Sequence, residues 1–299
     1  MKSLTRVLAL CTAITLAVSL SACVTNEEQG HPDGWEEVSP PAVPDITALV
    51  PQPLAEKGTL VASANPPFAP FEFKDSRHEI IGMEMDLMRA ASSVMGLKYQ
   101  PIEQDFSLIL PSLSAGTIDV GASGFTDNEE RRKNYDFVDF LYAGVQWGQQ
   151  VGSPVDPNNA CGLSIAVQRT TVADTDIVRP MSDDCVAQGK KPIEVLAYET
   201  SDQAATALVL GRADAFVADS PVLAWAISRS EGKLEAVGSI SDAAPHGFAV
   251  PKGSQLGTAL AAALQHLIKT GDYQRILKMW GIDEGLVSSA MINEVPIAQ

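Results

Sequence analysis

Apolar and polar residues follow two alternating patterns along the chain after Gly58. Short apolar runs bounded by glycine or polar residues predict strands, and apolar residues that recur every three to four positions predict helices. The predicted strands are Thr59–Ala64, Ile118–Ser123, Leu163–Gln168 and Ala213–Ala218. The predicted helices are Met83–Met95, Phe106–Ala115, Ser201–Leu210, Pro221–Glu231 and two stretches within Ser254–Trp280. This order predicts an α/β fold with a mostly parallel sheet.

The length of this part and a weak internal repeat predict two lobes. Leu113–Gly124 and Val209–Asp219 each run from a helix end through Gly-x-x-Asp into a short apolar strand. Gly124 and Asp219 therefore stand at comparable strand ends. Because ligands bind beyond the carboxyl ends of strands in open α/β sheets, we expect these two residues to face one cleft.

The N-terminus has the layout of a secretory signal. Lys2 and Arg6 flank the start of an apolar stretch, Val7–Leu20, that is shorter than the roughly 20 residues a membrane span needs. Leu20-Ser21-Ala22-Cys23 resembles a bacterial lipobox, so residues 1–22 are predicted to be a signal peptide and Cys23 to carry lipid. Ordinary cleavage beside a chance cysteine is the alternative. The mature chain is predicted to be extracytoplasmic and anchored to the cell membrane.

The segment after Cys23 is rich in proline and acidic residues and has no regular period. Residues 23–57 are therefore expected to form a flexible tether. Once Cys11 and Cys23 are accounted for, Cys161 and Cys185 remain, and two thiols outside the cell predict a disulfide. A metal site is the competing interpretation, but the four histidines show no ligand spacing. The net charge of −16 disfavours a nucleic-acid partner.

Residues 123–139 suit the binding of an anion. They end a predicted strand and open a short helix, with Thr126 or Asp127 as the expected N-cap. Backbone N–H groups, a hydroxyl and the guanidinium of Arg131 would together meet a carboxylate. The alternative is that Arg131 belongs to a solvated charged helix, since it lies in a run of charges.

Several motifs together resemble the polar amino-acid-binding proteins of ABC transporters, solute-binding protein family 3. In chain order they are Pro67–Phe73, Phe106–Leu113, Gly116–Asp119, Phe125–Asp127, Glu130–Arg131, Asp136–Tyr142, Gly211–Asp219 and Gly271–Gly281. The resemblance runs from about Gly58 to Asn293 and implies a two-lobed, periplasmic-binding-protein-like α/β fold of type II, with a ligand cleft between the lobes. Residues 58–145 and 248–299 would form lobe 1 and residues 146–247 lobe 2. Two hinge strands would cross near Gly144–Val151 and Gly247–Val250.

The resemblance also implies roles for individual residues. Arg131 would clamp the ligand α-carboxylate, and Asp219, from the other lobe, would pair with the ammonium. The remaining expected ligand-binding residues are Asn65, Phe68, Phe106, Ser123, Gly124, Thr126 and Thr171, with core packing as the alternative for the phenylalanines. Side-chain specificity is expected from Asn65, Ser123, Gln146, Gln168 and Ala218. Thr170 stands where the family has glycine and Val172 replaces a threonine, which makes the carboxylate contact from Thr171 uncertain.

The function implied by the resemblance is capture of an amino acid or related zwitterion for an ABC importer. The protein would be a monomer that needs no cofactor, and its partners would be the ligand, the ABC permease and the membrane. One alternative is a cyclohexadienyl dehydratase-like enzyme, with Glu72, Glu103 or Asp105 as the acid. Another is a ligand-sensing module.

Overall fold

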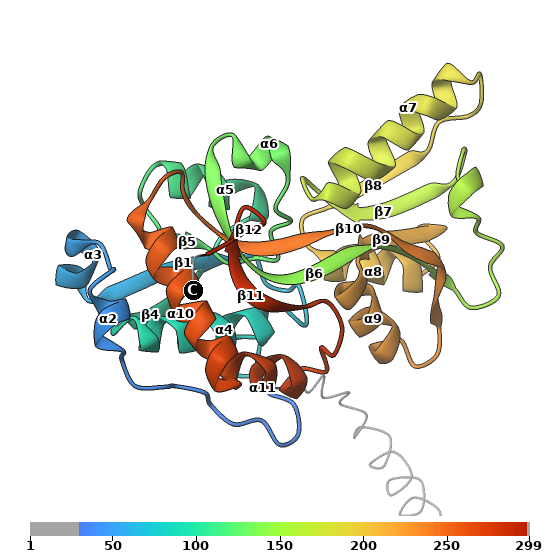
Figure 1. Cartoon of the computed structure of the whole chain (residues 1–299). Coiled ribbons are helices and arrows are strands. Elements are labelled where there is room, and N and C mark those ends of the chain that lie inside the picture. The colour runs from blue at the N-terminus through green and yellow to red at the C-terminus, as the bar shows by residue number, and fades with distance from the viewer. Residues whose placement is uncertain (1–29, 298–299) are drawn as a thin grey trace, which may run out of the picture.

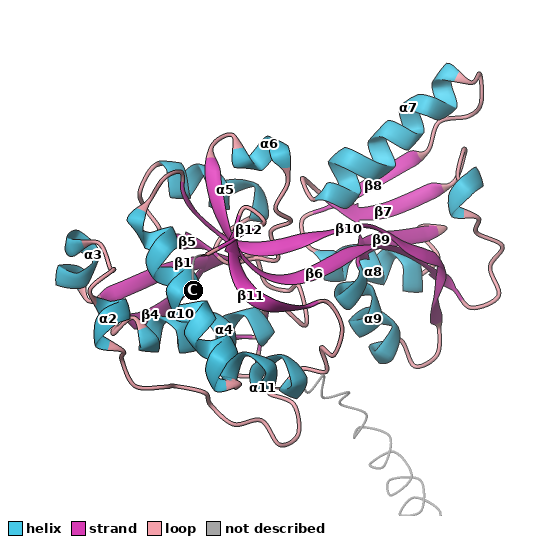
Figure 2. Ribbon diagram, in the orientation of Figure 1, coloured by secondary structure: helices cyan, strands magenta, loops and turns pink. Residues whose placement is uncertain are grey.

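Two long strands connect the two lobes of the protein (Figure 1). The computed structural model describes residues 30–297. Strands β6 (Tyr135–Gln150) and β10 (Leu234–Pro251) run antiparallel to each other through both lobes. They lie at the centre of a mixed sheet with the order β4-β1-β5-β10-β6-β9-β7-β8, and helices pack around it in each lobe (Figure 2). The predicted two-lobed α/β fold is confirmed, but the prediction of a mostly parallel sheet is wrong, because the two connecting strands run antiparallel to their neighbours β5 and β9 and to each other.

Lobe 1 contains one edge of the sheet and the C-terminal helices. Its parallel strands are β1 (Thr59–Ala64), β4 (Lys98–Glu103) and β5 (Val120–Gly121), beside a separate hairpin of β2 (Phe73–Lys74) and β3 (Ile80–Ile81). Its helices include α4 (Met83–Val94), α5 (Phe106–Ser114), α6 (Glu129–Arg132), α10 (Gln255–Thr270) and α11 (Asp272–Met279). The chain then adds β11 (Leu286–Ile292), which pairs with β6, and β12 (Val295–Pro296).

Lobe 2 contains the other edge of the sheet. Its strands are β7 (Ser164–Gln168), β8 (Glu194–Tyr198) and β9 (Ala215–Asp219). Its helices are α7 (Arg179–Ala187), α8 (Ser201–Val209) and α9 (Ser220–Arg229), with a 3-10 turn at Pro157–Asn159 and a π-helical segment at Ala173–Val178. The predicted Cys161–Cys185 disulfide is present and ties the segment before β7 to α7.

The crossing on β10 precedes the predicted stretch Gly247–Val250. The register between β10 and β6 shifts between Val237 and Ser241 and at two further points as far as Gly247. From Gly247 onward β10 pairs with residues 135–139 of β6, well inside lobe 1. Because bulges bend and twist a strand, this irregular stretch of β10 is where the chain changes lobe.

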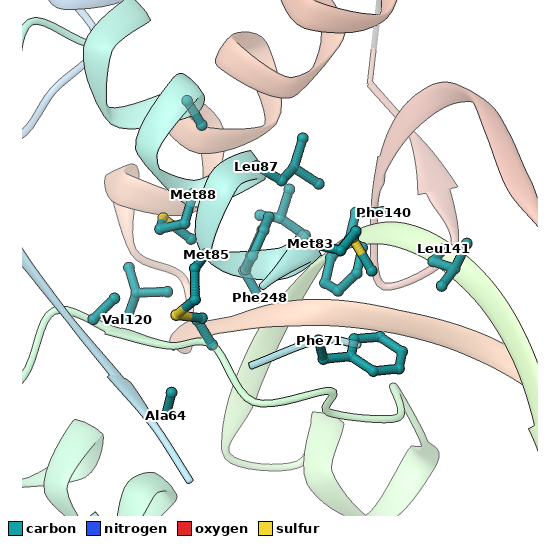
Figure 3. Close-up of a cluster of buried hydrophobic side chains, with 14 of the residues drawn as sticks. Ala64, Phe71, Met83, Met85, Leu87, Met88, Val120, Phe140, Leu141 and Phe248 are labelled. Atoms are coloured by element: carbon teal, nitrogen blue, oxygen red, sulfur yellow. The ribbon is translucent and has the colours of Figure 1, made fainter. Parts of the chain in front are cut away.

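The core of lobe 1 lies between α4 and the central strands. Methionine and leucine side chains of α4 lie over Phe140 of β6 and Phe248 of β10, all with no exposed surface (Figure 3). Burial of apolar surface stabilises the fold by about 25 cal/mol per Å². Lobe 1 thus gives the site a well-packed base.

The described part of the predicted tether, residues 30–57, is docked on lobe 1. It contains two short helices, α2 (Pro44–Thr47) and α3 (Gln52–Lys57). Four of its apolar side chains join the core: Val38, Ile46, Val50 and Leu54. Trp35 Nε1 donates to Asp86 Oδ2 at 2.6 Å. The prediction of a flexible tether is therefore wrong for these residues. Their apolar side chains are buried against lobe 1, but they are spaced without a regular period, so the sequence pattern does not reveal a buried face.

The predicted signal peptide, residues 1–22, and the predicted lipid site at Cys23 lie outside the described residues. Within residues 30–297, no helix is both long and apolar enough to cross a membrane.

Candidate functional site

A small cavity lies between the two lobes. Lobe 1 lines it with Phe68, Phe106, Ser123, Gly124, Thr126 and Arg131, and lobe 2 with Gln168, Thr171, Val172 and Asp219. All but one of the predicted ligand-binding residues are thus brought together, and the exception is Asn65. Phe68 and Phe106 line the cavity and also belong to buried hydrophobic clusters, so lining the cavity and packing in the core go together for both rings.

Arg131 reaches the cavity from α6. Asn128 caps this helix by accepting from the Arg131 backbone N–H at 2.9 Å, so the predicted caps Thr126 and Asp127 were wrong. The Arg131 guanidinium donates to the Thr126 carbonyl at 2.8 Å and lies 5.8 Å from the centre of the Phe106 ring. Burial lowers the pKa of Arg131, and the nearby Asp219 opposes that shift. An arginine stays charged despite such a shift, so the group is a fixed cation in the cavity wall.

Ser123 and Gly124 form the floor next to Phe68. Gly124 has φ +55°, and a Cβ there would stand 2.5 Å from the Phe68 ring, so glycine is required on both counts. The Gly124 N–H donates to Glu84 Oε2 at 2.7 Å, and the Ser123 hydroxyl donates to Glu72 Oε1 at 2.5 Å. The floor is thus held from behind by two buried carboxyl groups.

Glu72 and Glu84 have no exposed surface. Burial raises the pKa of Glu84 to about 8. Burial, together with the charge of Glu84, raises the pKa of Glu72 well above its usual value. Low-dielectric surroundings disfavour the charged form of each acid. Burial behind the floor therefore favours the protonated form of both acids.

Asp219 faces the cavity from lobe 2. It ends β9, directly before α9, and its side chain is 12 % exposed. Its Oδ2 lies 3.4 Å from His246 Nε2 on β10. The cavity therefore has a cation on its lobe 1 wall and a carboxylate on its lobe 2 wall.

The turn after β7 contains Thr170 and Val172, the two residues that differ from the pattern implied by the resemblance. Thr170 adopts φ +61°, the left-handed conformation that favours glycine. Asp174 holds the turn by accepting from the Thr170 N–H at 3.0 Å. The Thr171 hydroxyl donates to the Gln168 carbonyl at 2.8 Å, so its proton is already used within lobe 2. Val172 lines the cavity where the family's threonine would stand.

Asn65 lies behind Gln168 and does not line the cavity. Its Oδ1 accepts from Gln168 Nε2 at 2.7 Å, which joins the two lobes across the cleft. Gln168 was expected only as one of several candidates for specificity, and its place at the carboxyl end of β7 is the sequence signal for it. Gln146 and Ala218, two other candidates, pair with each other on β6 and β9 outside the cavity wall.

The acids considered for catalysis lie away from the cavity wall. Glu72 is behind Ser123. Glu103 and Asp105 are exposed, and Glu103 pairs with Lys74 at 2.5 Å. Across residues 30–297, no group of three or more histidine, cysteine or acidic side chains is placed to hold a metal ion.

Two lobes, two connecting strands and an enclosed cavity with opposed charges define a solute-binding protein of the periplasmic type II class. Residues 60–283 match the model of the bacterial extracellular solute-binding proteins, family 3. The chain belongs to this family.

The chain is also similar to individual proteins. It is 64% identical over 286 residues to arginine-binding protein ArgT of Corynebacterium glutamicum, with 95% of this chain and 94% of that protein covered. A mutant of ArgBP from T. maritima superposes with a TM-score of 0.70 at 26% identity, covering 77% of this chain and 97% of that one. An ancestral arginine-binding protein bound to arginine gives a TM-score of 0.67 at 30% identity, covering 75% and 98%.

Proposed function

We propose that this protein captures arginine outside the cytoplasm and delivers it to the permease of an ABC importer. The observation that carries the proposal is the pair of opposed charges, Arg131 and Asp219, in one enclosed cavity. The ligand class is supported by the similar protein of Corynebacterium glutamicum, which is named for arginine binding.

The two ends of an α-amino acid fit the two walls. The planar guanidinium of Arg131 suits two-point binding of the α-carboxylate. The Asp219 carboxylate takes the α-ammonium, together with the Gly124 carbonyl and the Thr126 hydroxyl. Because Arg131 belongs to lobe 1 and Asp219 to lobe 2, one zwitterion satisfies both only when the lobes are closed. The ligand therefore favours the closed state by its differential contacts.

The remaining cavity wall suits an apolar chain with a cationic end. Phe68 and Phe106 contribute aromatic rings to this wall, and a guanidinium can stack on such a ring. The net charge of −16 favours the approach of a cation at low salt. Val172 keeps the lobe 2 wall apolar beside Thr171.

We infer that residues 1–22 direct export and that lipidated Cys23 holds the protein at the membrane. Only six residues, 24–29, separate Cys23 from the docked residues 30–57. The linker in this proposal is therefore shorter than the flexible linker of 34 residues (24–57) that the sequence suggested. A shorter linker would hold the folded lobes nearer to the membrane and the permease. The protein acts as a monomer in this proposal.

The proposed role is binding without catalysis. Glu72 is buried behind Ser123, whose hydroxyl donates to its Oε1. A substrate in the cavity would meet Ser123 before it met this acid.

The test is a ligand screen on purified protein that has been unfolded, freed of ligand and refolded with its disulfide intact. Thermal shift and calorimetry should give one-to-one binding of arginine and an unchanged ligand afterwards. Lysine, histidine, glutamine, glutamate and prephenate complete the panel. The absence of a thermal shift with arginine would overturn the proposal that arginine is the ligand. Consumption of prephenate during incubation would overturn the proposal that the protein binds its ligand without catalysis.

A further inference from the structure

We propose that the side-chain oxygen of Gln168 reads the N–H donors at the end of the ligand side chain, and that Asn65 positions it from the opposite lobe. This inference rests on the proposed function. It concerns an acceptor in the cavity wall that no contact within the described protein satisfies.

Gln168 is 3 % exposed and lines the cavity from the end of β7. Its Nε2 donates to Asn65 Oδ1 at 2.7 Å and to the Glu199 carbonyl at 3.3 Å. Its Oε1 is buried, and among the described residues it has no hydrogen-bond partner. A buried acceptor left unpaired is costly, so a donor supplied by the ligand would be strongly favoured there.

The orientation of the Gln168 amide follows from a chain of hydrogen bonds. Asn65 Nδ2 donates to the Gln104 carbonyl at 3.0 Å, which leaves Asn65 Oδ1 turned toward Gln168. An oxygen can be met only by a donor, so the amide nitrogen of Gln168 must face Asn65. The Gln168 oxygen is then the part of the amide that is free for a ligand.

Other polar groups of the wall are already committed. The Ser123 hydroxyl donates to Glu72 and accepts from the Asn65 backbone N–H at 3.1 Å. The Thr171 hydroxyl donates to the Gln168 carbonyl. With Asp219 and the Thr126 hydroxyl assigned to the α-ammonium, Gln168 Oε1 is the side-chain acceptor left for the far end of the ligand.

This arrangement makes recognition of the side chain conditional on closure. Asn65 belongs to lobe 1 and Gln168 to lobe 2, so the bond that orients the amide exists only while the lobes are together. A guanidinium or ureido end supplies N–H donors to the oxygen. A carboxylate end would place two acceptors face to face, and an alkyl end would leave the oxygen unpaired.

The first measurement compares ligands on the unaltered protein. Arginine should bind at least about 10-fold more tightly than norleucine, since norleucine has no donor at its end. Citrulline, which keeps N–H donors without the charge, should also bind more tightly than norleucine. Equal affinity for arginine and norleucine would overturn the inference while leaving amino-acid capture intact. Failure to bind arginine at all would instead overturn the proposed function.

The second measurement removes the acceptor. Gln168→Met keeps the length of the side chain, and it should lower the arginine affinity by about 10-fold or more while changing the norleucine affinity little. Gln146→Met is the matched control, because it removes a lobe 2 amide outside the cavity wall. If Gln168→Met lowered the affinities for arginine and norleucine equally, Gln168 would contribute only to lobe closure. The proposed recognition of the ligand side chain by Gln168 would then be wrong.

The third measurement separates Asn65 from Gln168. Asn65→Ala should reduce the preference for arginine over norleucine in the unaltered background and have no further effect on that preference in the Gln168→Met background. A purely structural role for Asn65 would leave the preference unchanged in the first background, and that result would overturn its positioning role.

Discussion

The two walls of the cavity differ in what they offer a ligand and in how they are supported. The lobe 1 wall presents the cation Arg131 and rests on packed core and buried carboxyl groups. The lobe 2 wall presents the acceptors Asp219 and Gln168 from the ends of two strands. The cation and the carboxylate of the site are therefore on opposite sides of the hinge. A ligand that carries both kinds of group joins the walls, which links recognition to closure.

Removing the lobe 1 cation should have the largest effect. Arg131→Ala is expected to lower the affinity for arginine by at least about 100-fold, because the α-carboxylate loses a charge-assisted, two-point contact in an enclosed site. Calorimetry measures the loss, and circular dichroism checks the fold. Lys133→Ala is the control, since Lys133 lies two residues further along the chain and its exposed side chain pairs with Glu130. Affinity equal to that of the unaltered protein would contradict the role of the lobe 1 cation in binding the carboxylate.

The sequence predicts the lobe 1 wall better than the lobe 2 wall. The strand Thr59–Ala64 has the same bounds in the structure, and residues 123–131 supply most of the lobe 1 contacts. Local pattern marks the strand end and the short helix in residues 123–131, and the family resemblance assigned the individual contacts. The sequence pattern could not tell which of Asn65 and Gln168 lines the cavity. That depends on a hydrogen bond between the two side chains across the cleft.

The docked N-terminal segment, residues 30–57, shows the same limit in the fold. Its buried residues are separated by prolines and acidic residues, so no period indicates a buried face. Their burial depends on α4 and α10, which the chain supplies later. A periodic sequence pattern predicts helices and strands that have one apolar face. It misses segments such as residues 30–57, whose irregularly spaced apolar residues are buried against elements that are distant in the sequence.

The buried acids behind the lobe 1 wall should make stability depend on pH. Glu84 titrates near pH 4.5 when unfolded and at about 8 when folded, so its folded-state pKa is raised. Between these values the folded protein keeps a proton that the unfolded chain has lost, and the free energy of unfolding falls as pH rises. Denaturant titrations from pH 5 to 8 should show this decline.

Glu84→Gln should flatten that decline, because the amide can still accept from the Gly124 N–H and does not ionise. A slope remains from Asp139, whose burial raises its pKa to about 8, and from Glu72. Glu103→Gln is the control, since Glu103 is exposed and far from the floor. An unchanged slope in Glu84→Gln would contradict the assignment of a buried proton to this acid.

The smallest expected effect tests the turn that carries the lobe 2 wall. Thr170 is exposed, but its backbone is in the left-handed region, where a β-branched residue is strained. Thr170→Gly should raise the free energy of unfolding by about 1 kcal/mol or less, because relief of the strain is partly offset by the greater freedom of glycine in the unfolded chain. The N–H bond to Asp174 is kept, so arginine affinity should change by less than about twofold. Thr170→Ala keeps the Cβ and should gain less stability than Thr170→Gly. An equal gain in both variants would mean that the threonine side chain, rather than the backbone angle, sets the cost of this turn.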